Sequence, residues 1–328
     1  MTSVSGAARA FWVTEPGRGE IRTVPVPDVG PDEVLVRTRC TAVSRGTEAL
    51  VFRGEVPESE HLTMRAPFQE GEFPGPVKYG YLAVGDVEQG PPGLLGRTVF
   101  CLHPHQSRFV VPADAVTPVP DDVPPGRAVL AGTVETAVNA VWDAAPLVGD
   151  RIAVVGAGMV GASVAAVLAG IPGARVELVD TDPVRAPVAE ALGVGFAAPQ
   201  DAAGDCDLVV HASATGAGLA RSLELLAPEG EVIELSWYGT RRIELALGGA
   251  FHSRRLAVRA SQVGTVAPRR ARRGYADRMK LALRLLADPR FDVLIDRECR
   301  LEELPEMMAG ETTGEPRGLG IRVLYGDS

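Results

Sequence analysis

Three glycines with a fixed spacing constrain this chain more than any other feature of its sequence. Gly156, Gly158 and Gly161 form the pattern G-x-G-x-x-G directly after the apolar run 151–155, and a stretch with helical periodicity, 160–168, follows them. In this setting Gly156 is predicted to make a tight turn, Gly158 to leave the backbone open, and Gly161 to let helix and strand pack closely. The pattern therefore predicts a strand–turn–helix unit whose free N–H groups can bind an anion.

Strand and helix signals alternate beyond this unit. Apolar runs that are expected to be strands are separated by stretches with helical periodicity, at 175–179, 184–192, 207–211, 218–226 and 231–235. Such alternation is typical of a parallel sheet with helices on both faces. The fold class expected for residues 135–262 is therefore α/β, with the doubly wound parallel sheet of a Rossmann domain.

An acidic residue stands where a dinucleotide site needs one. Asp180 ends the second predicted strand, nineteen residues after Gly161. A carboxylate there accepts hydrogen bonds from the adenosine ribose and repels a 2′-phosphate, which predicts NAD rather than NADP. A membrane helix over 152–174 is disfavoured because Arg175 and Asp180 interrupt the apolar sequence that follows. The residues expected to contact NAD are Gly156, Gly158, Met159, Val160, Gly161, Asp180, Thr181, Arg185, Ser213, Ser236 and Gln262.

The two ends of the chain have a different character from its middle. Short strand-like runs separated by Gly and Pro dominate the first third, for example 33–39, 97–102 and 108–112. A helix is expected over 127–145. Beyond residue 262 we expect an arginine-rich helix, a short acidic helix at 301–308 and a last strand at 321–325. These signals predict that 1–134 and 263–328 form one β-rich domain, with the Rossmann domain at 135–262 between them.

Charge and cysteine content exclude several classes of protein. The formal net charge of −9 argues against a nucleic-acid partner, because phosphates would be repelled. The four cysteines lie far apart without a C-x-x-C pair, which argues against a zinc finger or a disulfide framework. Residues 1–10 lack the apolar run of a secretory signal. We expect a cytoplasmic protein with no membrane partner.

The whole arrangement resembles the medium-chain dehydrogenase/reductase superfamily. The resemblance covers nearly the whole chain, and besides the glycine pattern its local motifs are Ser44-Arg-Gly-Thr-Glu48 with Arg53-Gly54, Lys78-Tyr-Gly-Tyr81 with Val84-Gly-Asp86, and Arg97-Thr-Val99. It implies that the β-rich part is a GroES-like catalytic domain. It also implies a small-molecule substrate and a homodimer.

The zinc-binding positions of that superfamily hold other residues here. In the zinc alcohol dehydrogenases of the superfamily, three side chains hold the catalytic zinc, and the matching positions in this chain are Arg45, Tyr81 and Thr133. None of these is a plausible zinc ligand, so no metal site is expected. The pattern is similar to that of the bacteriochlorophyllide dehydrogenase-like branch, whose members carry a comparable Gly-Thr-Glu signature.

Without zinc, a side chain must exchange the proton at the substrate oxygen. By the resemblance, Tyr81 is the candidate acid or base, and Lys78 would lower its pKa; alternatively, both only fill the space left by zinc. Thr47 matches the proton-relaying hydroxyl of the zinc enzymes, or is an ordinary turn residue. Glu48 is expected to orient its neighbours.

Three histidines have expected places in the fold. His103 falls where the superfamily places a pocket-lining aromatic residue, and it is expected either to titrate near neutral pH in the site or to lie in an exposed loop. For His105 the exposed loop is preferred. His211, at the end of a strand, is expected to pack on the adenine side of the nucleotide.

Three functions remain open from the sequence. The leading hypothesis is a zinc-independent, NAD(H)-dependent oxidoreductase that interconverts a hydroxyl and a carbonyl on a small molecule. The second is an NAD(P)H-dependent quinone or enoyl reductase acting on C=C bonds, which Asp180 disfavours because those enzymes usually use NADPH. The third is a non-catalytic NAD-binding redox sensor or partner subunit.

Overall fold

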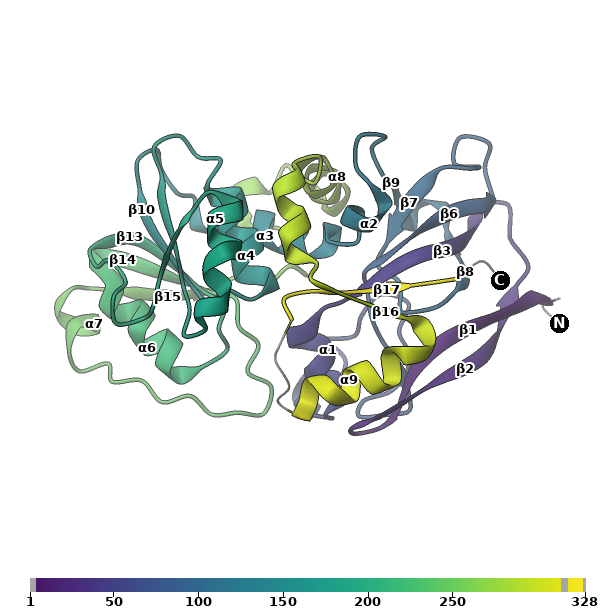
Figure 1. Cartoon of the computed structure of the whole chain (residues 1–328), viewed down its shortest axis with the longest axis horizontal. Coiled ribbons are helices and arrows are strands. Elements are labelled where there is room, and N and C mark those ends of the chain that lie inside the picture. Colours follow the sequence, from purple (N-terminus) through teal and green to yellow (C-terminus); the bar gives the residue numbers. More distant parts are fainter. Residues whose placement is uncertain (1–3, 314–317, 327–328) are drawn as a thin grey trace. The chain divides into compact units, whose positions relative to one another are not determined.

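The computed structural model describes residues 4–313 and 318–326 of the chain (Figure 1). The chain forms two compact units, one made of Met1–Gly132 and Ile295–Ser328 and the other of Thr133–Leu294. Among the residues that the structure describes, no helix combines the length and the apolar character needed to cross a bilayer.

The first unit is built from two sheets. The smaller has the strand order β2-β1-β5-β4, and the larger has the order β16-β17-β3-β6-β7-β9, with β8 also paired to β3. The strands are β1 (Val4–Glu15), β2 (Arg18–Pro27), β3 (Glu33–Val43), β4 (Glu70–Gly71), β5 (Val77–Lys78), β6 (Ala83–Gln89), β7 (Thr98–Cys101), β8 (Arg108–Pro112), β9 (Val116–Pro118), β16 (Arg297–Arg300) and β17 (Ile321–Leu324). The last strand pairs antiparallel with β3, which confirms that the end of the chain returns to the β-rich part.

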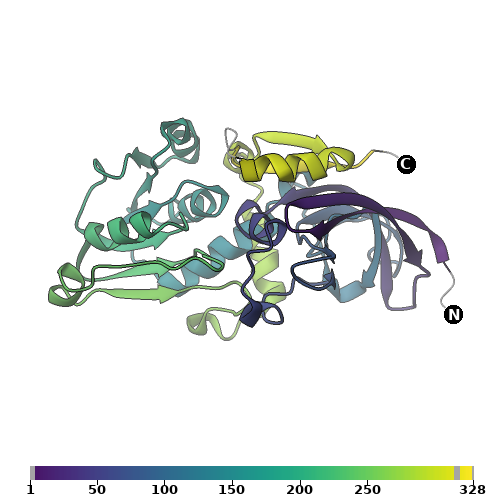
Figure 2. The ribbon, with the colours of Figure 1, turned by 90° about the horizontal axis from the view of Figure 1, so that it is seen from below.

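Short helices complete this unit. They are α1 (Arg45–Phe52), α2 (Pro125–Ala128) and α9 (Leu304–Thr313). The yellow helix α9 lies beside the purple ribbon of β1 and β2 in both views of the molecule (Figures 1 and 2). Inward-facing residues of β3, β6, β7 and β8 form the core, including Val34, Val36, Val99 and Phe109.

The second unit contains the predicted parallel sheet. Its order is β12-β11-β10-β13-β14-β15, and every pairing in it is parallel. The strands are β10 (Arg151–Val155), β11 (Arg175–Val179), β12 (Gly195–Ala197), β13 (Cys206–His211), β14 (Leu226–Glu234) and β15 (Ala257–Ala260). Because the order runs one way to β11 and the other way to β13, the switch point lies at the carboxyl end of β10. Figure 1 shows β10, β13, β14 and β15 side by side.

Helices accompany this sheet: four of them lie between its strands in the sequence, one precedes the first strand and one follows the last. They are α3 (Ala131–Ala144), α4 (Met159–Leu168), α5 (Ala186–Leu192), α6 (Gly216–Leu225), α7 (Ala250–Ser253) and α8 (Tyr275–Leu285). The central strands form the apolar core of this unit, in which Ala153, Val209 and Val232 are fully buried.

The second boundary between the units differs from the predicted one. Residues 263–294, which we expected in the β-rich part, cluster with the parallel-sheet unit. The reason is Arg278 on α8, which is 1% exposed. Its guanidinium lies 3.0 Å from a carboxylate oxygen of Glu135 on α3, and it also donates to Asn139. A buried guanidinium has to be paired, and its partners tie α8 to α3.

Candidate functional site

The glycine turn after β10 has the geometry that its spacing predicts. Gly156 has φ +105°, and a Cβ there would lie 2.6 Å from the backbone nitrogen of Ser213. A Cβ on Gly161 would lie 1.9 Å from the carbonyl oxygen of Gly156. Gly158, in contrast, is exposed and has open space where its Cβ would be. The turn is therefore closed at two glycines and open at the third, at the N-terminus of α4, where a diphosphate can approach the backbone.

The Asp180 carboxylate lies beside this turn. One of its oxygens accepts a hydrogen bond from the backbone N–H of Ala157 at 2.7 Å, and the other accepts from the N–H of Asp182 at 2.9 Å. These bonds fix the carboxylate between the glycine turn and the loop after β11. Each oxygen keeps a lone pair, so the group can still accept hydrogen bonds from ribose hydroxyls.

Other predicted cofactor residues have varied surroundings. Met159 is buried, and its sulfur accepts a hydrogen bond from the Thr133 hydroxyl, whereas Val160 is half-buried and Thr181 is exposed. Arg185 is buried with its guanidinium 3.6 Å from Asp182. Gln262 is exposed on the segment after β15. Ser213 lies against the glycine turn, because its backbone nitrogen would be 2.6 Å from a Cβ on Gly156.

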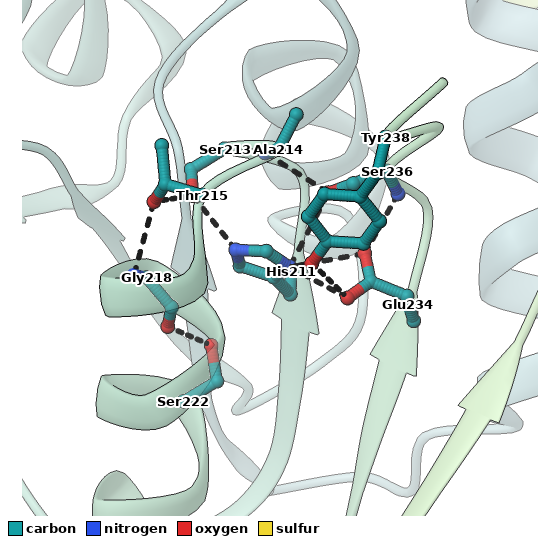
Figure 3. A network of polar contacts seen from close by, with 9 residues as sticks. All are labelled: His211, Ser213, Ala214, Thr215, Gly218, Ser222, Glu234, Ser236 and Tyr238. Carbon is teal, nitrogen blue, oxygen red and sulfur yellow. Dashed lines mark hydrogen bonds and ion pairs between the residues drawn. The ribbon is translucent and has the colours of Figure 1, made fainter. Parts of the chain in front are cut away.

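A polar network occupies the carboxyl ends of β13 and β14 (Figure 3). His211 Nδ1 lies 2.8 Å from the nearer carboxylate oxygen of Glu234, and Nε2 lies 2.7 Å from Ser213 Oγ. The Tyr238 hydroxyl donates to Glu234 at 2.9 Å, and the backbone N–H of Ser236 donates to the same carboxylate at 2.7 Å. The predicted residues Ser213 and Ser236 therefore share one hydrogen-bond network.

Burial and hydrogen bonding act in opposite directions on the Glu234 carboxyl. Burial raises its pKa, but the hydrogen bonds and charge of His211 and the donors of Ser236 outweigh it, so the net pKa is lowered. Glu234 is therefore an anion near neutral pH and can accept a hydrogen bond from His211 Nδ1–H.

The sheet order corrects the expectation for His211. It was predicted to pack on the adenine side, but β13 lies on the opposite side of β10 from β11, the strand that carries Asp180. A dinucleotide whose adenosine ribose contacts Asp180 would extend its other half toward β13 and β14. The sequence reasoning also missed Glu234, although an acid at the end of a buried strand was a visible signal.

In the β-rich unit, hydroxyl groups hold the Tyr81 phenol. It donates a hydrogen bond to Ser44 Oγ at 2.6 Å, and Thr47 hydrogen-bonds it as well. Ser44 precedes α1, and Thr47 lies in its first turn. Burial raises the pKa of Tyr81 to about 12, the two hydroxyls lower it, and Glu48 raises it. Tyr81 is therefore a neutral phenol at physiological pH.

A buried carboxylate–imidazole pair lies next to these residues. Glu48 Oε2 is 2.9 Å from His105 Nε2, and the other carboxylate oxygen accepts from the Ser44 backbone N–H at 2.7 Å. His105 is 1% exposed, so its predicted place in an exposed loop is wrong. Its ring packs against Gly80, where a Cβ would lie 2.9 Å from it. The role expected for Glu48, orienting its neighbours, is consistent with these bonds.

Lys78 does not lower the pKa of Tyr81, contrary to what was expected. Its ammonium is buried, and it lies 2.5 Å from Glu70 Oε1 and 2.6 Å from Gln106 Oε1. It is not among the groups that shift the pKa of Tyr81, which is raised rather than lowered. The expectation rested on closeness in sequence, but Glu70 and Gln106 hold the Lys78 ammonium instead.

His103 is buried in an aromatic stack. The centroid of its ring lies 3.8 Å from the ring centroid of Phe109 and 5.6 Å from that of Phe68. Its Nδ1 atom forms a hydrogen bond with the Pro104 carbonyl. Burial lowers the pKa of His103 to about 3, so the expected titration near neutral pH is wrong, and so is the exposed-loop alternative. Phe68 belongs to the segment 55–75, and Phe73 of the same segment contacts the ring of Tyr79.

The residues at the three zinc positions do not fit a metal ion. Arg45 carries a positive charge and donates to the Gly318 carbonyl, Tyr81 keeps its proton, and Thr133 donates to Met159. Zinc in proteins prefers thiolate, imidazole and carboxylate ligands. Within the described ranges, no group of three or more His, Cys, Asp or Glu residues is arranged to hold a metal.

Comparison with solved structures identifies the fold of the chain. A protein of Sinorhizobium meliloti described as a zinc-binding dehydrogenase and solved with NADP has a TM-score of 0.77, with 17% identity over 98% of this chain and 100% of that one. An alcohol dehydrogenase of Escherichia coli, solved with NADH, also has a TM-score of 0.77, with 14% identity and the same coverage. The chain therefore has the fold of these dehydrogenases, a Rossmann unit combined with a GroES-like one.

Sequence similarity to curated proteins is partial. An L-threonine 3-dehydrogenase of Mesorhizobium japonicum is 29% identical over 196 residues, which cover 52% of this chain and 56% of that protein. The chain thus spans about half the length of the curated relative. No family model matches the sequence. The relatives and the shared fold support the medium-chain dehydrogenase superfamily.

Proposed function

We propose that this chain is an NAD(H)-dependent oxidoreductase that interconverts a hydroxyl and a carbonyl on a small organic substrate, with Tyr81 rather than a zinc ion exchanging the proton. The observation that carries the proposal is the open turn at Gly158 beside the fixed carboxylate of Asp180. The dehydrogenase relatives support the same class of reaction. Within the superfamily, the bacteriochlorophyllide dehydrogenase-like branch stays a prediction.

The nucleotide site supports NAD over NADP through charge. The backbone N–H groups that begin α4 would hold the diphosphate, and Asp180 would accept the ribose hydroxyls. A 2′-phosphate would meet the Asp180 carboxylate, while the nearby Arg185 already lies beside Asp182. The nicotinamide, when bound, supplies or accepts the hydride. Ser213 and Ser236 offer hydroxyls at the edge of the sheet toward which that half would extend.

The residues of the β-rich unit support acid–base chemistry without a metal. Tyr81 is protonated near neutral pH, and when its hydroxyl turns from Ser44 toward a substrate carbonyl oxygen it can donate a hydrogen bond there and transfer the proton as the alcohol forms. Ser44 and Thr47 hold the phenol and would stabilise the phenolate that is left. In the direction of alcohol oxidation, the same phenolate takes the proton back.

Hydride transfer by metal-stripped protein tests the proposal. Protein dialysed against a strong chelator, with its metal content measured, is mixed with NADH and a panel of aldehydes and ketones, and with NAD and the matching alcohols. The proposal expects turnover that added zinc does not increase. Activity that disappears on chelation and returns with zinc would refute the role of Tyr81.

The same assay separates the other two functions. Enones and quinones are included, each with NADH and with NADPH. Consumption of NADPH on enones alone would favour a C=C reductase. Tight NADH binding without hydride transfer to any compound in a wide panel would favour a non-catalytic redox sensor.

A further inference from the structure

A surface cavity of about 480 Å³ lies within the β-rich unit. Its wall is formed by Arg9 of β1, by Ser107, by residues 300–302 at the end of β16, and by residues 324–326 at the end of β17. Neither Tyr81 nor the two hydroxyl residues that hold its phenol line this cavity. Its volume is within the range of small-molecule sites in proteins, about 300–1,000 Å³.

Hydrogen bonds hold the wall of this cavity in place. Arg9 and Ser107 are bonded twice, because the Arg9 backbone N–H donates to Ser107 Oγ at 2.9 Å and the Ser107 N–H donates to the Arg9 carbonyl at 2.9 Å. The Glu303 carboxylate accepts from the Arg300 backbone N–H at 2.7 Å, at the start of the 3-10 turn Leu301–Glu303. A ligand would therefore meet a preformed wall that it does not have to order.

Positive charge exceeds negative charge in the wall. Arg9 and Arg300 contribute two guanidinium groups and Glu302 contributes one carboxylate, which leaves one net positive charge on a chain whose formal net charge is −9. Glu302 is already paired with Arg9. Arg300 is exposed, and no acidic side chain of the residues that the structure describes pairs with its guanidinium. The wall therefore has a guanidinium that is available to an anion.

Hydrogen-bond donors are also in excess in the wall. Ser107 Oγ accepts from the Arg9 backbone N–H, so its own O–H can donate to a ligand. The Arg9 guanidinium has five N–H donors, of which the bond to Glu302 uses one. The carboxylate of Glu302 is occupied by this bond. An excess of donors favours a ligand whose polar end is an acceptor, and a carboxylate forms strong hydrogen bonds with guanidinium groups.

Apolar side chains form another part of the wall. Leu301 is 3% exposed and Leu324 is 38% exposed. Covering apolar surface is favourable by about 25 cal/mol per Å². An inorganic anion would leave Leu324 in contact with water, whereas a carboxylate attached to an apolar group would cover it. The wall therefore fits an organic anion better than an inorganic one.

We propose that this cavity binds a small organic carboxylate, whose charged group contacts Arg300 and Ser107 and whose apolar part covers Leu301 and Leu324. The proposal goes beyond the proposed function, because binding at this site requires neither a dinucleotide nor hydride transfer. It can therefore be tested on protein with no measurable turnover.

Three probes separate the contributions of the charge and of the apolar part. Benzoate and benzamide have the same ring, but only benzoate is an anion at pH 7, and inorganic phosphate has charge without a ring. Backbone amide chemical shifts follow the titration of each probe into the native protein, Arg300→Gln and Arg284→Gln. The last is the matched control, because Arg284 is an exposed arginine of α8 that pairs with no acidic side chain within the described ranges.

We expect saturable binding of benzoate to the native protein, with the largest shifts at Ser107, Leu301 and Gly326. Benzamide and phosphate should bind the native protein at least about tenfold more weakly, since each lacks one of the two contacts. Arg300→Gln should lose about tenfold in benzoate affinity with an unchanged melting temperature, and Arg284→Gln should bind benzoate like the native protein.

Three results would overturn the proposal. They are benzoate shifts that do not saturate or that lie outside the cavity, benzamide or phosphate binding as tight as that of benzoate, and native benzoate affinity in Arg300→Gln. The outcome does not depend on the proposed function, because no arm of the experiment contains a dinucleotide.

Discussion

The fully buried imidazole of His211 lies between the Glu234 carboxylate, 2.8 Å from Nδ1, and the Ser213 hydroxyl, 2.7 Å from Nε2. His211 ends β13 and Glu234 ends the neighbouring parallel strand β14. Both strands lie on the side of the switch point away from Asp180. The pair therefore fixes the direction of the Ser213 hydroxyl at the edge where the nicotinamide half of a dinucleotide is expected. A buried carboxylate is costly to leave without its hydrogen-bond donors.

Replacing Glu234 with Gln should destabilise the protein. Three donors, from His211, Ser236 and Tyr238, converge on the carboxylate, and an amide can accept at only one of its two ends. We expect the free energy of unfolding at pH 7 to fall by about 1–3 kcal/mol in urea denaturation. The lowered pKa of Glu234 means that its contribution is present above the carboxyl's ordinary pKa and is lost as the pH falls through the folded-state pKa.

The difference in the free energy of unfolding between the native protein and Glu234→Gln should therefore become smaller at acidic pH. Glu231→Gln, on the same strand, is the control, because Glu231 pairs with Arg259 at the surface and should contribute less than about 1 kcal/mol. Equal stability of the Glu234 variant and the native protein at pH 7 would contradict the importance of the pair.

Two glycines of the turn should respond differently to alanine. Gly161→Ala places a Cβ against the carbonyl oxygen of Gly156 and should lower the melting temperature strongly. Gly158→Ala meets open space, so the fold should keep its melting temperature, yet the added methyl group would lie where the diphosphate approaches. We expect its NADH affinity to fall by about tenfold or more in a fluorescence titration. Native affinity in Gly158→Ala would mean that the dinucleotide does not approach this turn.

His103 should make the protein sensitive to acid. Its folded-state pKa of about 3 lies below the ordinary 6.5, so its contribution to stability is present above pH 6.5 and is lost as the pH falls toward 3. His103→Phe keeps an aromatic ring in the stack but cannot be protonated. Denaturation between pH 7 and 4 should show a smaller loss for this variant than for the native protein. Replacing the exposed His252 with Gln should leave the acid sensitivity as it is.

Tyr81→Phe should abolish proton transfer without disturbing the nucleotide site. The variant keeps the ring but loses the hydroxyl that bonds Ser44, so we expect kcat to fall by about a hundredfold or more with unchanged NADH affinity. Because the pKa of Tyr81 is about 12, the phenol remains an acid across neutral pH, and carbonyl reduction should not lose this donor until strongly alkaline pH. Tyr79→Phe is the control, and a near-native kcat in Tyr81→Phe would remove Tyr81 from the mechanism.

The nucleotide half of the account was largely predictable from the sequence. β10 and β11 have the predicted bounds, because buried parallel strands are continuous apolar runs. The glycine turn and Asp180 could be predicted because their chemistry depends on neighbours that are close in sequence. The end of the chain could also be assigned, since both ends of the sequence are β-rich around an α/β middle, and β17 pairs with β3.

Long-range contacts explain what the sequence did not reveal. Lys78 contacts Gln106, and Glu48 contacts His105, across 28 and 57 residues. The assignment of residues 263–294 depends on the contact between Arg278 and Glu135, which are 143 residues apart. Burial of the two loop histidines depends on such contacts as well, and no local pattern distinguishes a buried histidine from an exposed one.

Equilibrium binding of the two reduced cofactors tests the central claim most directly. NADH and NADPH are titrated separately into the native protein and into Asp180→Ser, with binding measured by the change in dinucleotide fluorescence. The account predicts that the native protein binds NADH at least about tenfold more tightly than NADPH, and that Asp180→Ser narrows this difference. Equal or tighter binding of NADPH by the native protein, or no binding of either cofactor, would contradict it.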